Sequence, residues 1–211
     1  MNRFLNPLVR QLSRAGALHR RPAAWAVLAG VLVVAVGVAS KAGFVVSGQR
    51  EAGASDKVAY TLAGRVVHVA DGDTFTLLVD GRRERIRMAS IDAPETRKNR
   101  ERPGQPMAQA AKQALAGLVA GKTLALSCFE HDRYGRNVCD VPLPDGSTAN
   151  RELVAEGLAW ANGEGQGRYM RDRRLPGLEA AAREARKGIW SEPSPVPPWV
   201  WRYQCWKHGQ C

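Results

Sequence analysis

The amino-acid sequence predicts an α+β fold, mainly β, in which a five-stranded Greek-key barrel is packed against about three helices. Two observations predict this class. Five strand-like runs occur as a group of three and a group of two, with a helix-like run between the groups. Two further helix-like runs follow the last strand. Mixed order of this kind excludes an all-helical bundle and a sheet built from repeated strand–helix units.

The first three strands are expected to form consecutive hairpins. Residues 60–69 are rich in Val and alternate between apolar and polar side chains, and residues 74–79 follow a turn at Asp71-Gly72. Residues 83–91 follow a second turn at Asp80-Gly81. Asp-Gly between two such runs is a strong hairpin signal because both residues tolerate positive φ.

The second half of the predicted barrel begins with a helix. Pro106 is expected to open it, because Pro at the first helical position needs no amide partner, and Gly121 to end it. Its apolar residues recur at helical spacing: Met107, Ala111, Leu115, Leu118 and Val119. Strands are expected over residues 122–129 and 137–143, and helices over 149–160 and 176–187. The last helix is expected to turn Leu178, Ala181, Ala182 and Ala185 inward, and Trp160 and Trp190 are expected in the core at helix ends. This order of elements is that of a barrel of the OB type.

An apolar segment near the N-terminus predicts export. Residues 23–39 are all apolar or Gly and, with residues 44–46, approach the ~20 residues that cross a bilayer. Five arginines precede the run, which favours a cytoplasmic N-terminus and a translocated remainder. An uncleaved anchor in the inner membrane, with the domain on the periplasmic or extracytoplasmic side, is the preferred interpretation; cleavage would give a secreted protein.

The chain is therefore expected to have five parts. These are a basic cytoplasmic N-terminus (1–22), a signal anchor or signal peptide (23–46), a linker (47–57), a barrel domain (58–190) and a Pro- and Trp-rich tail (191–211). The formal net charge is +11, of which the first 47 residues supply +6 and the remainder +5. A mildly basic domain favours a polyanionic partner only weakly. We expect the chain to act as a monomer.

The four cysteines agree with export because all of them follow the apolar segment. Their spacing does not suit a zinc site, so two disulfides are the preferred interpretation, and buried free thiols are the alternative. If the turn centres on Arg133 and Tyr134, Cys128 and Cys139 face each other across a hairpin. Cys205 and Cys211 would then pair by elimination.

Five residues in four short motifs point to phosphodiester chemistry. Such hydrolysis needs charge neutralised on the phosphate oxygens, an activated water and a stabilised leaving group. Asp73 and Asp92 offer hard oxygen ligands for a cation near the ends of neighbouring strands. Glu95 can orient or deprotonate a water, and Arg87 and Arg136 can bond bidentately to a phosphate.

In these motifs the chain resembles the staphylococcal nuclease (thermonuclease) family over roughly residues 60–190. The resemblance implies an OB-fold hydrolase that needs Ca²⁺ and cuts DNA and RNA with little sequence preference. It also implies 3′-phosphorylated products. The residues that it implies are Asp73, Asp92 and the backbone carbonyl of Ala93 as calcium ligands, and Arg87, Glu95 and Arg136 as catalytic residues. Arg133 and Tyr134 resemble flanking substrate contacts.

The chain departs from the family pattern in two places. The best-known member has Thr at the position of Ala93, which matters little because the ligand is a backbone carbonyl. That member also places tyrosines and a lysine after the second late helix, where this chain has the Gly-rich stretch 162–167. Tyr169 is consequently only a candidate for nucleotide stacking. The aromatic residues of the tail are expected to pack on the barrel, in a tail of irregular structure.

Two other functions compete with an active nuclease. The first is a catalytically silent OB-fold module that binds single-stranded nucleic acid or a partner protein. Silent copies typically lose acidic and arginine site residues, whereas all five are present here. The second is a membrane-anchored scaffold, which has only the Pro- and Trp-rich tail in its favour.

Overall fold

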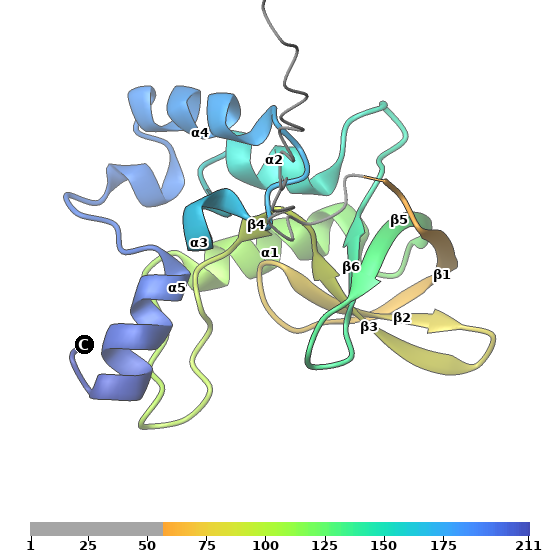
Figure 1. Ribbon diagram of the computed structural model, residues 1–211, viewed down its shortest axis with the longest axis horizontal. Helices are drawn as coiled ribbons and strands as arrows, with labels where there is room; N and C mark the ends of the chain where they lie inside the picture. The colour runs from red at the N-terminus through yellow and green to blue at the C-terminus, as the bar shows by residue number, and fades with distance from the viewer. Residues whose placement is uncertain (1–56) are drawn as a thin grey trace, which may run out of the picture. The chain divides into compact units, whose positions relative to one another are not determined.

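Residues 57–211, the part of the chain that the computed structural model describes, contain a closed five-stranded barrel (Figure 1). Its strands neighbour one another in the order β1-β2-β3-β6-β5. β1 closes the barrel against β5 as an antiparallel pair, and β3 runs parallel to β6. The barrel strands are β1 (Tyr60–Val69), β2 (Thr74–Val79), β3 (Arg82–Met88), β5 (Thr123–His131) and β6 (Asn137–Asp140). The predicted α+β class and the five-stranded barrel are thus confirmed.

The hairpin between β2 and β3 forms at the predicted Asp-Gly turn. Asp80 and Gly81 have φ of 48° and 78°, so both central residues take the left-handed conformation that a tight two-residue hairpin requires. The resulting register pairs Phe75 with Ile86, and both side chains are fully buried. Alternation along the strands therefore places apolar side chains inside the barrel.

The third predicted strand is divided in two. The sequence predicts one strand over residues 83–91, but β3 ends at Met88 and a separate β4 (Ile91–Asp92) follows. Ser90 causes the break, because its φ of 63° turns the chain out of the barrel. β4 then pairs with β7 (Trp160–Ala161) in a two-stranded sheet. This turn positions Asp92 beside the barrel rather than on it.

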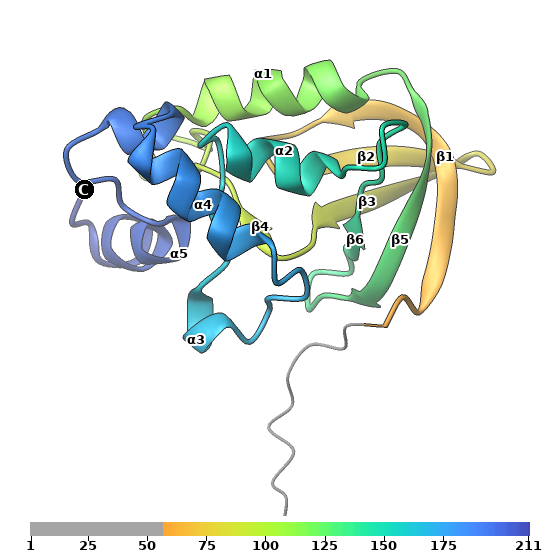
Figure 2. The same cartoon turned by 90° about the horizontal axis from the view of Figure 1, so that it is seen from above.

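Three helices of seven residues or more pack beside the barrel within the described residues (Figure 2). They are α1 (Ala108–Val119), α2 (Ala149–Ala155) and α4 (Leu175–Glu184), and α2 contacts both of the others. α1 buries Ala111, Leu115 and Val119, as the helical spacing predicts. The Gly-rich loop contains one short turn, α3 (Glu164–Gly167).

Several predicted helix details were wrong. Pro106 does not open α1, because Met107 follows it with a left-handed φ of 63° before the helix begins. α2 ends five residues early because Gly157, at φ 66°, turns the chain, so Trp160 lies in a strand. On α4 the buried residues are Leu175 and Ala182, whereas Ala181 and Ala185 are exposed. Trp160 and Trp190 are buried as predicted, Trp190 in the 3₁₀ turn η1 (Gly188–Ser191).

The C-terminal tail (residues 191–211) forms helical turns rather than the irregular structure expected from its prolines. Pro198 opens α5 (Pro198–Trp201), where a missing amide hydrogen costs nothing, and a π-helical turn η2 (Arg202–Lys207) continues it. The indole N–H groups of Trp201 and Trp206 both donate to the Pro103 carbonyl oxygen, at 3.2 and 2.9 Å. The tail therefore packs on the loop before α1, beside which it lies in Figure 1.

Both expected disulfides are present, Cys128–Cys139 and Cys205–Cys211. Cys128 and Cys139 are directly opposed in the register of β5 and β6. The turn itself is not centred as expected, because His131 pairs with Asn137 and an irregularity beyond Cys128 shifts the register by one residue. A bulge of this kind restores the predicted pair while moving the turn.

No helix within residues 57–211 is long and apolar enough to span a bilayer. The apolar segment at 23–46, together with the basic N-terminus and most of the linker, lies outside the described residues.

Candidate active site

Asp73 is held in place by the turn between β1 and β2. Its carboxylate accepts hydrogen bonds from the backbone N–H of Ala93, at 2.7 Å, and from the hydroxyl of Thr74, at 3.0 Å. The adjacent Gly72 is needed because a Cβ there would lie 2.7 Å from the Cβ of Ala93 and 2.8 Å from that of Ala111. The turn can therefore approach Ala93 closely enough for Asp73 to bond its backbone.

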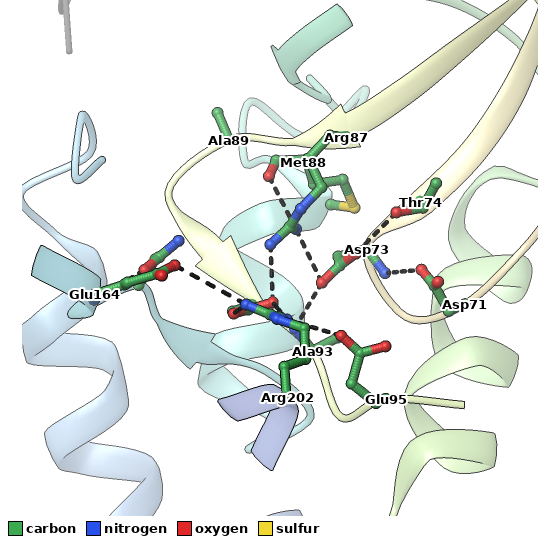
Figure 3. Close-up of polar contacts among 12 residues, drawn as sticks. Asp71, Asp73, Thr74, Arg87, Met88, Ala89, Ala93, Glu95, Glu164 and Arg202 are labelled. Carbon is green, nitrogen blue, oxygen red and sulfur yellow. Dashed lines mark hydrogen bonds and ion pairs between the residues drawn. The ribbon is translucent and has the colours of Figure 1, made fainter. Parts of the chain in front are cut away.

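Arg87 joins the two aspartates. It lies on β3 opposite Thr74, and its Nη1 is 2.9 Å from Oδ2 of Asp73, while its Nη2 is 2.8 Å from Oδ1 of Asp92. The side chains of Asp73 and Asp92 are 9% and 2% exposed, so the fork is a nearly buried arrangement. Figure 3 shows Arg87 reaching toward Asp73. The guanidinium of Arg87 thus holds two negatively charged carboxylates close to each other.

Glu95 follows on a rigid segment beyond Pro94. Its backbone is fixed by Gln105, whose side-chain oxygen accepts the Glu95 N–H at 3.0 Å and whose own N–H donates to the Glu95 carbonyl at 2.8 Å. Burial raises the pKa of Glu95 from 4.5 to about 7, against the lowering effect of a hydrogen bond from Arg202; the charges of Asp73 and Asp92 also raise it. Such a carboxyl can exchange a proton near neutral pH.

Arg202 is the site residue that the sequence analysis missed. Its Nη1 lies 2.7 Å from Oε1 of Glu95, and its Nη2 lies 2.8 Å from Oδ2 of Asp92. In Figure 3 the guanidinium of Arg202 lies between Glu95 and Glu164, and its Nη2 is 3.9 Å from Oε2 of Glu164. No local motif marks Arg202, which is 107 residues from Glu95 in the chain.

Arg136 lies apart from this cluster. Its Nε is 2.6 Å from Oδ2 of Asp132 within the turn between β5 and β6, and Asp132 also accepts the backbone N–H groups of Tyr134 and Arg136. The guanidinium groups of Arg133 and Arg136 lie 4.9 and 5.5 Å from the Tyr134 ring centre. Hydrogen bonds to Asp132 lower its pKa despite partial burial. The structure thus places the predicted catalytic Arg136 and the predicted substrate contacts Arg133 and Tyr134 on one turn.

Tyr169, the weakest of the predicted substrate contacts, is 40% exposed. Arg168 stacks over its ring at 5.8 Å. Its carbonyl accepts a hydrogen bond from Ser90, at 3.4 Å, which ties it to the turn before Asp92. Tyr169 is therefore near the site through its backbone, and the exposed part of its ring, beside Arg168, can contact a ligand.

The donor atoms around Asp73 suit a hard cation. Within residues 57–211 no group of three or more His, Cys, Asp and Glu side chains could hold a metal. Asp73 and Asp92 share Arg87, and the backbone N–H of Ala93 donates to Asp73, so two carboxylates meet here beside the Ala93 peptide. All-oxygen donors fit calcium or magnesium and not zinc, and water and substrate would supply the other ligands.

Together, a closed barrel and a cluster of three carboxylates with an arginine fork define a protein that can hydrolyse phosphodiesters. Comparison with known proteins agrees. A family model described as "Staphylococcal nuclease homologue" matches residues 85–192. That range includes Arg87, Asp92, Glu95 and Arg136, and it ends before Arg202.

Curated relatives point the same way. The chain is 40% identical over 141 residues to an "Uncharacterized endonuclease" of Escherichia coli O157:H7, covering 67% of this chain and 85% of the relative. It is 39% identical over 150 residues to the "Micrococcal nuclease" of Shigella flexneri, covering 66% and 79%. A third relative, "Protein ParB" of Escherichia coli, is 38% identical over 149 residues. The chain belongs to the staphylococcal nuclease family and is a nuclease that hydrolyses phosphodiester bonds.

Proposed function

We propose that this nuclease hydrolyses both DNA and RNA with little sequence preference, uses calcium, and leaves 3′-phosphorylated products. The observation that carries the proposal is the Arg87 fork, which brings Asp73 and Asp92 together next to Ala93. Two aspartate carboxylates and the Ala93 carbonyl would hold the ion. Bound there, calcium would supply positive charge to the phosphate oxygens and so stabilise charge that develops in the transition state.

The remaining steps fall to the protein's own side chains. Glu95, whose pKa lies near 7, accepts the proton of the attacking water. Arg87 and Arg136 donate hydrogen bonds to the phosphate oxygens, and Arg133 and Tyr134 contact the flanking nucleotide. Because the Arg136 side chain contacts Asp132 and Tyr134 of its own turn, it can reorient toward a bound phosphate without disturbing the barrel.

The experiment is cleavage of single-stranded DNA, double-stranded DNA and RNA by the purified full chain, with calcium or with excess EDTA. We expect cleavage of all three substrates with calcium, no turnover in EDTA, and 3′-phosphate ends on the products. Asp73→Asn should raise the calcium needed or abolish activity. Asp80→Asn is the matched control, because it removes one carboxylate from an exposed turn that Asn also tolerates. Full turnover in EDTA would contradict the proposed metal requirement.

We also propose that the nuclease domain is exported and remains tethered by the apolar segment at 23–46. Two disulfides support an oxidising compartment, and the arginines before the apolar run support a cytoplasmic N-terminus. A reporter that is active only in the cytoplasm, fused after Cys211, should be silent. Strong reporter activity would reverse the topology.

A further inference from the structure

The C-terminal tail places a guanidinium on the carboxylates that the proposed function assigns to metal binding and catalysis. Arg202 bonds both oxygens of Asp92, with Nη1 3.2 Å from Oδ1 and Nη2 2.8 Å from Oδ2. It also bonds Glu95 at 2.7 Å. Two forked, charge-assisted contacts of this kind are the strong form of the arginine–carboxylate interaction.

Contacts that do not involve the site hold the tail at this position. The tryptophans on either side of Arg202 donate to the Pro103 carbonyl, and Gln105 donates its side-chain N–H to the Val196 carbonyl at 2.7 Å. Cys205 is buried, and its disulfide to Cys211 closes the end of the tail. Arg202 therefore stays near the carboxylates at high effective concentration, whether or not its own side chain is bonded.

Two features leave room for the tail and for the Arg202 side chain to move. A cavity of about 340 Å³ lies between the first part of the tail (residues 192–196) and residues that include Gln105, Met107 and Trp160. The Arg202 side chain is 33% exposed, compared with 13% for Arg87. Because a third of its side chain is open to solvent, the guanidinium of Arg202 can leave the carboxylates without unfolding the barrel.

We propose that Arg202 is a built-in competitor for the calcium ion, so that the tail lowers the affinity of the nuclease for its metal. This inference rests on the proposed calcium site. Arg87 bonds Oδ1 of Asp92, whereas Arg202 also covers Oδ2. A guanidinium and a divalent cation repel each other at close range, so only Arg202 or the calcium ion can occupy Oδ2. The apparent dissociation constant then equals the intrinsic one divided by the fraction of molecules in which Arg202 is displaced.

Calcium titration of the metal-free full chain tests the competition without any substrate. The readout is the NMR shift of the Ala93 amide, which bonds Asp73 directly. If Arg202 occupies the carboxylates in about nine of ten molecules, Arg202→Ala tightens calcium binding about tenfold. Arg202→Lys, which keeps the charge and loses the fork, should tighten it by less. Lys207→Ala removes the same charge from an exposed residue of the tail and should leave the affinity unchanged.

The outcomes separate the inference from the proposed function. Equal or weaker calcium binding by both Arg202 variants would overturn the competition, even if the wild-type chain cleaves DNA with calcium. Failure of the wild-type chain and of both variants to bind calcium would overturn it too. Tighter binding by Arg202→Ala supports the competition even where no variant cleaves nucleic acid, and in that case the proposed function fails alone.

Discussion

Asp92 is held by two arginines that come from distant parts of the described chain, and they hold it in different ways. Arg87 extends from barrel strand β3, is 13% exposed and joins Asp92 to Asp73. Arg202 extends from the tail, is 33% exposed and joins Asp92 to Glu95. The first arginine is fixed by the pairing of β2 and β3, whereas the second depends on two tryptophans and a loop carbonyl.

Because of this difference, Arg87 is a permanent part of the site, whereas Arg202 occupies the site and can be displaced. Removing one partner from a nearly buried ion pair leaves a charge without compensation, which is costly. Partly exposed pairs contribute less because solvent screens them and because ordering long side chains costs entropy. Arg87 therefore keeps the two aspartates together permanently, while Arg202 can be exchanged for a ligand.

Among the arginine variants, Arg87→Lys is expected to have the largest effect. Lysine is a point charge and cannot bond Asp73, Asp92 and a phosphate with one fork, so turnover on DNA should fall roughly 10²–10³-fold. Arg202→Lys, measured in the same steady-state assay at saturating calcium, should keep wild-type turnover. Equal losses in the two variants would mean that both arginines act on the substrate and that the contrast between them is wrong.

Arg136 is a third arginine with which Arg87 and Arg202 can be compared, and the variant is Arg136→Lys. It should lower turnover about 10²-fold through loss of the bidentate contact to phosphate. Its partner Asp132 lies on an exposed turn, so the urea midpoint for unfolding should stay within error of wild type. For Arg87→Lys we expect that midpoint to fall as well. A wild-type rate for Arg136→Lys would remove Arg136 from the catalytic group.

The pKa of Glu95, the second carboxylate that Arg202 bonds, also reports on the Arg202 contact. Burial raises it to about 7 and the bond from Arg202 lowers it, so Arg202→Ala should raise it further. Because folded Glu95 binds its proton more tightly than unfolded Glu95, its contribution to stability is present below about pH 4.5 and is lost as the pH rises toward 7. Carboxyl NMR titration of the metal-free chain measures the pKa. A value near 4.5 in both proteins would refute the burial argument.

Trp206→Phe should have the smallest effect. It removes one of two indole donors to the Pro103 carbonyl while keeping most of the ring, so the free energy of unfolding should fall by about 1 kcal/mol. Turnover at saturating calcium should not change, because no site residue is touched. Denaturant unfolding measures the loss, and a drop in turnover equal to that of Arg87→Lys would show that the tail supports the site directly.

The sequence predicted the barrel better than what surrounds it. β1 and β2 match their predicted ranges, because alternation and Asp-Gly turns are local signals that the hairpins obey. The ends of the other elements were less predictable, since Ser90 after β3, Met107 before α1 and Gly157 after α2 take positive φ that no local pattern marks. The helical turns of the tail were missed because its prolines were interpreted as breakers, whereas Pro198 occupies a first-turn position.

The candidate site likewise has residues that the sequence predicts and one residue that it does not. Asp73, Arg87, Asp92 and Glu95 lie within short motifs, and their types alone indicate phosphodiester chemistry. Arg202 is one of many arginines in a basic chain, and nothing local distinguishes it. Its role follows only from a contact that spans 110 residues, and periodicity or composition cannot show such a contact.

The most direct test of the central assignment is Glu95→Gln, with Glu101→Gln as a matched control on the exposed part of the same loop. Glutamine keeps the shape of the side chain and removes its ability to accept the proton of water. Turnover of the full chain should fall roughly 10²–10⁴-fold in Glu95→Gln, while affinity for a DNA oligonucleotide, measured by fluorescence anisotropy, is maintained. Glu101→Gln should match the wild type in both measurements. Near wild-type turnover by Glu95→Gln would show that the carboxylate cluster described here is not the catalytic centre.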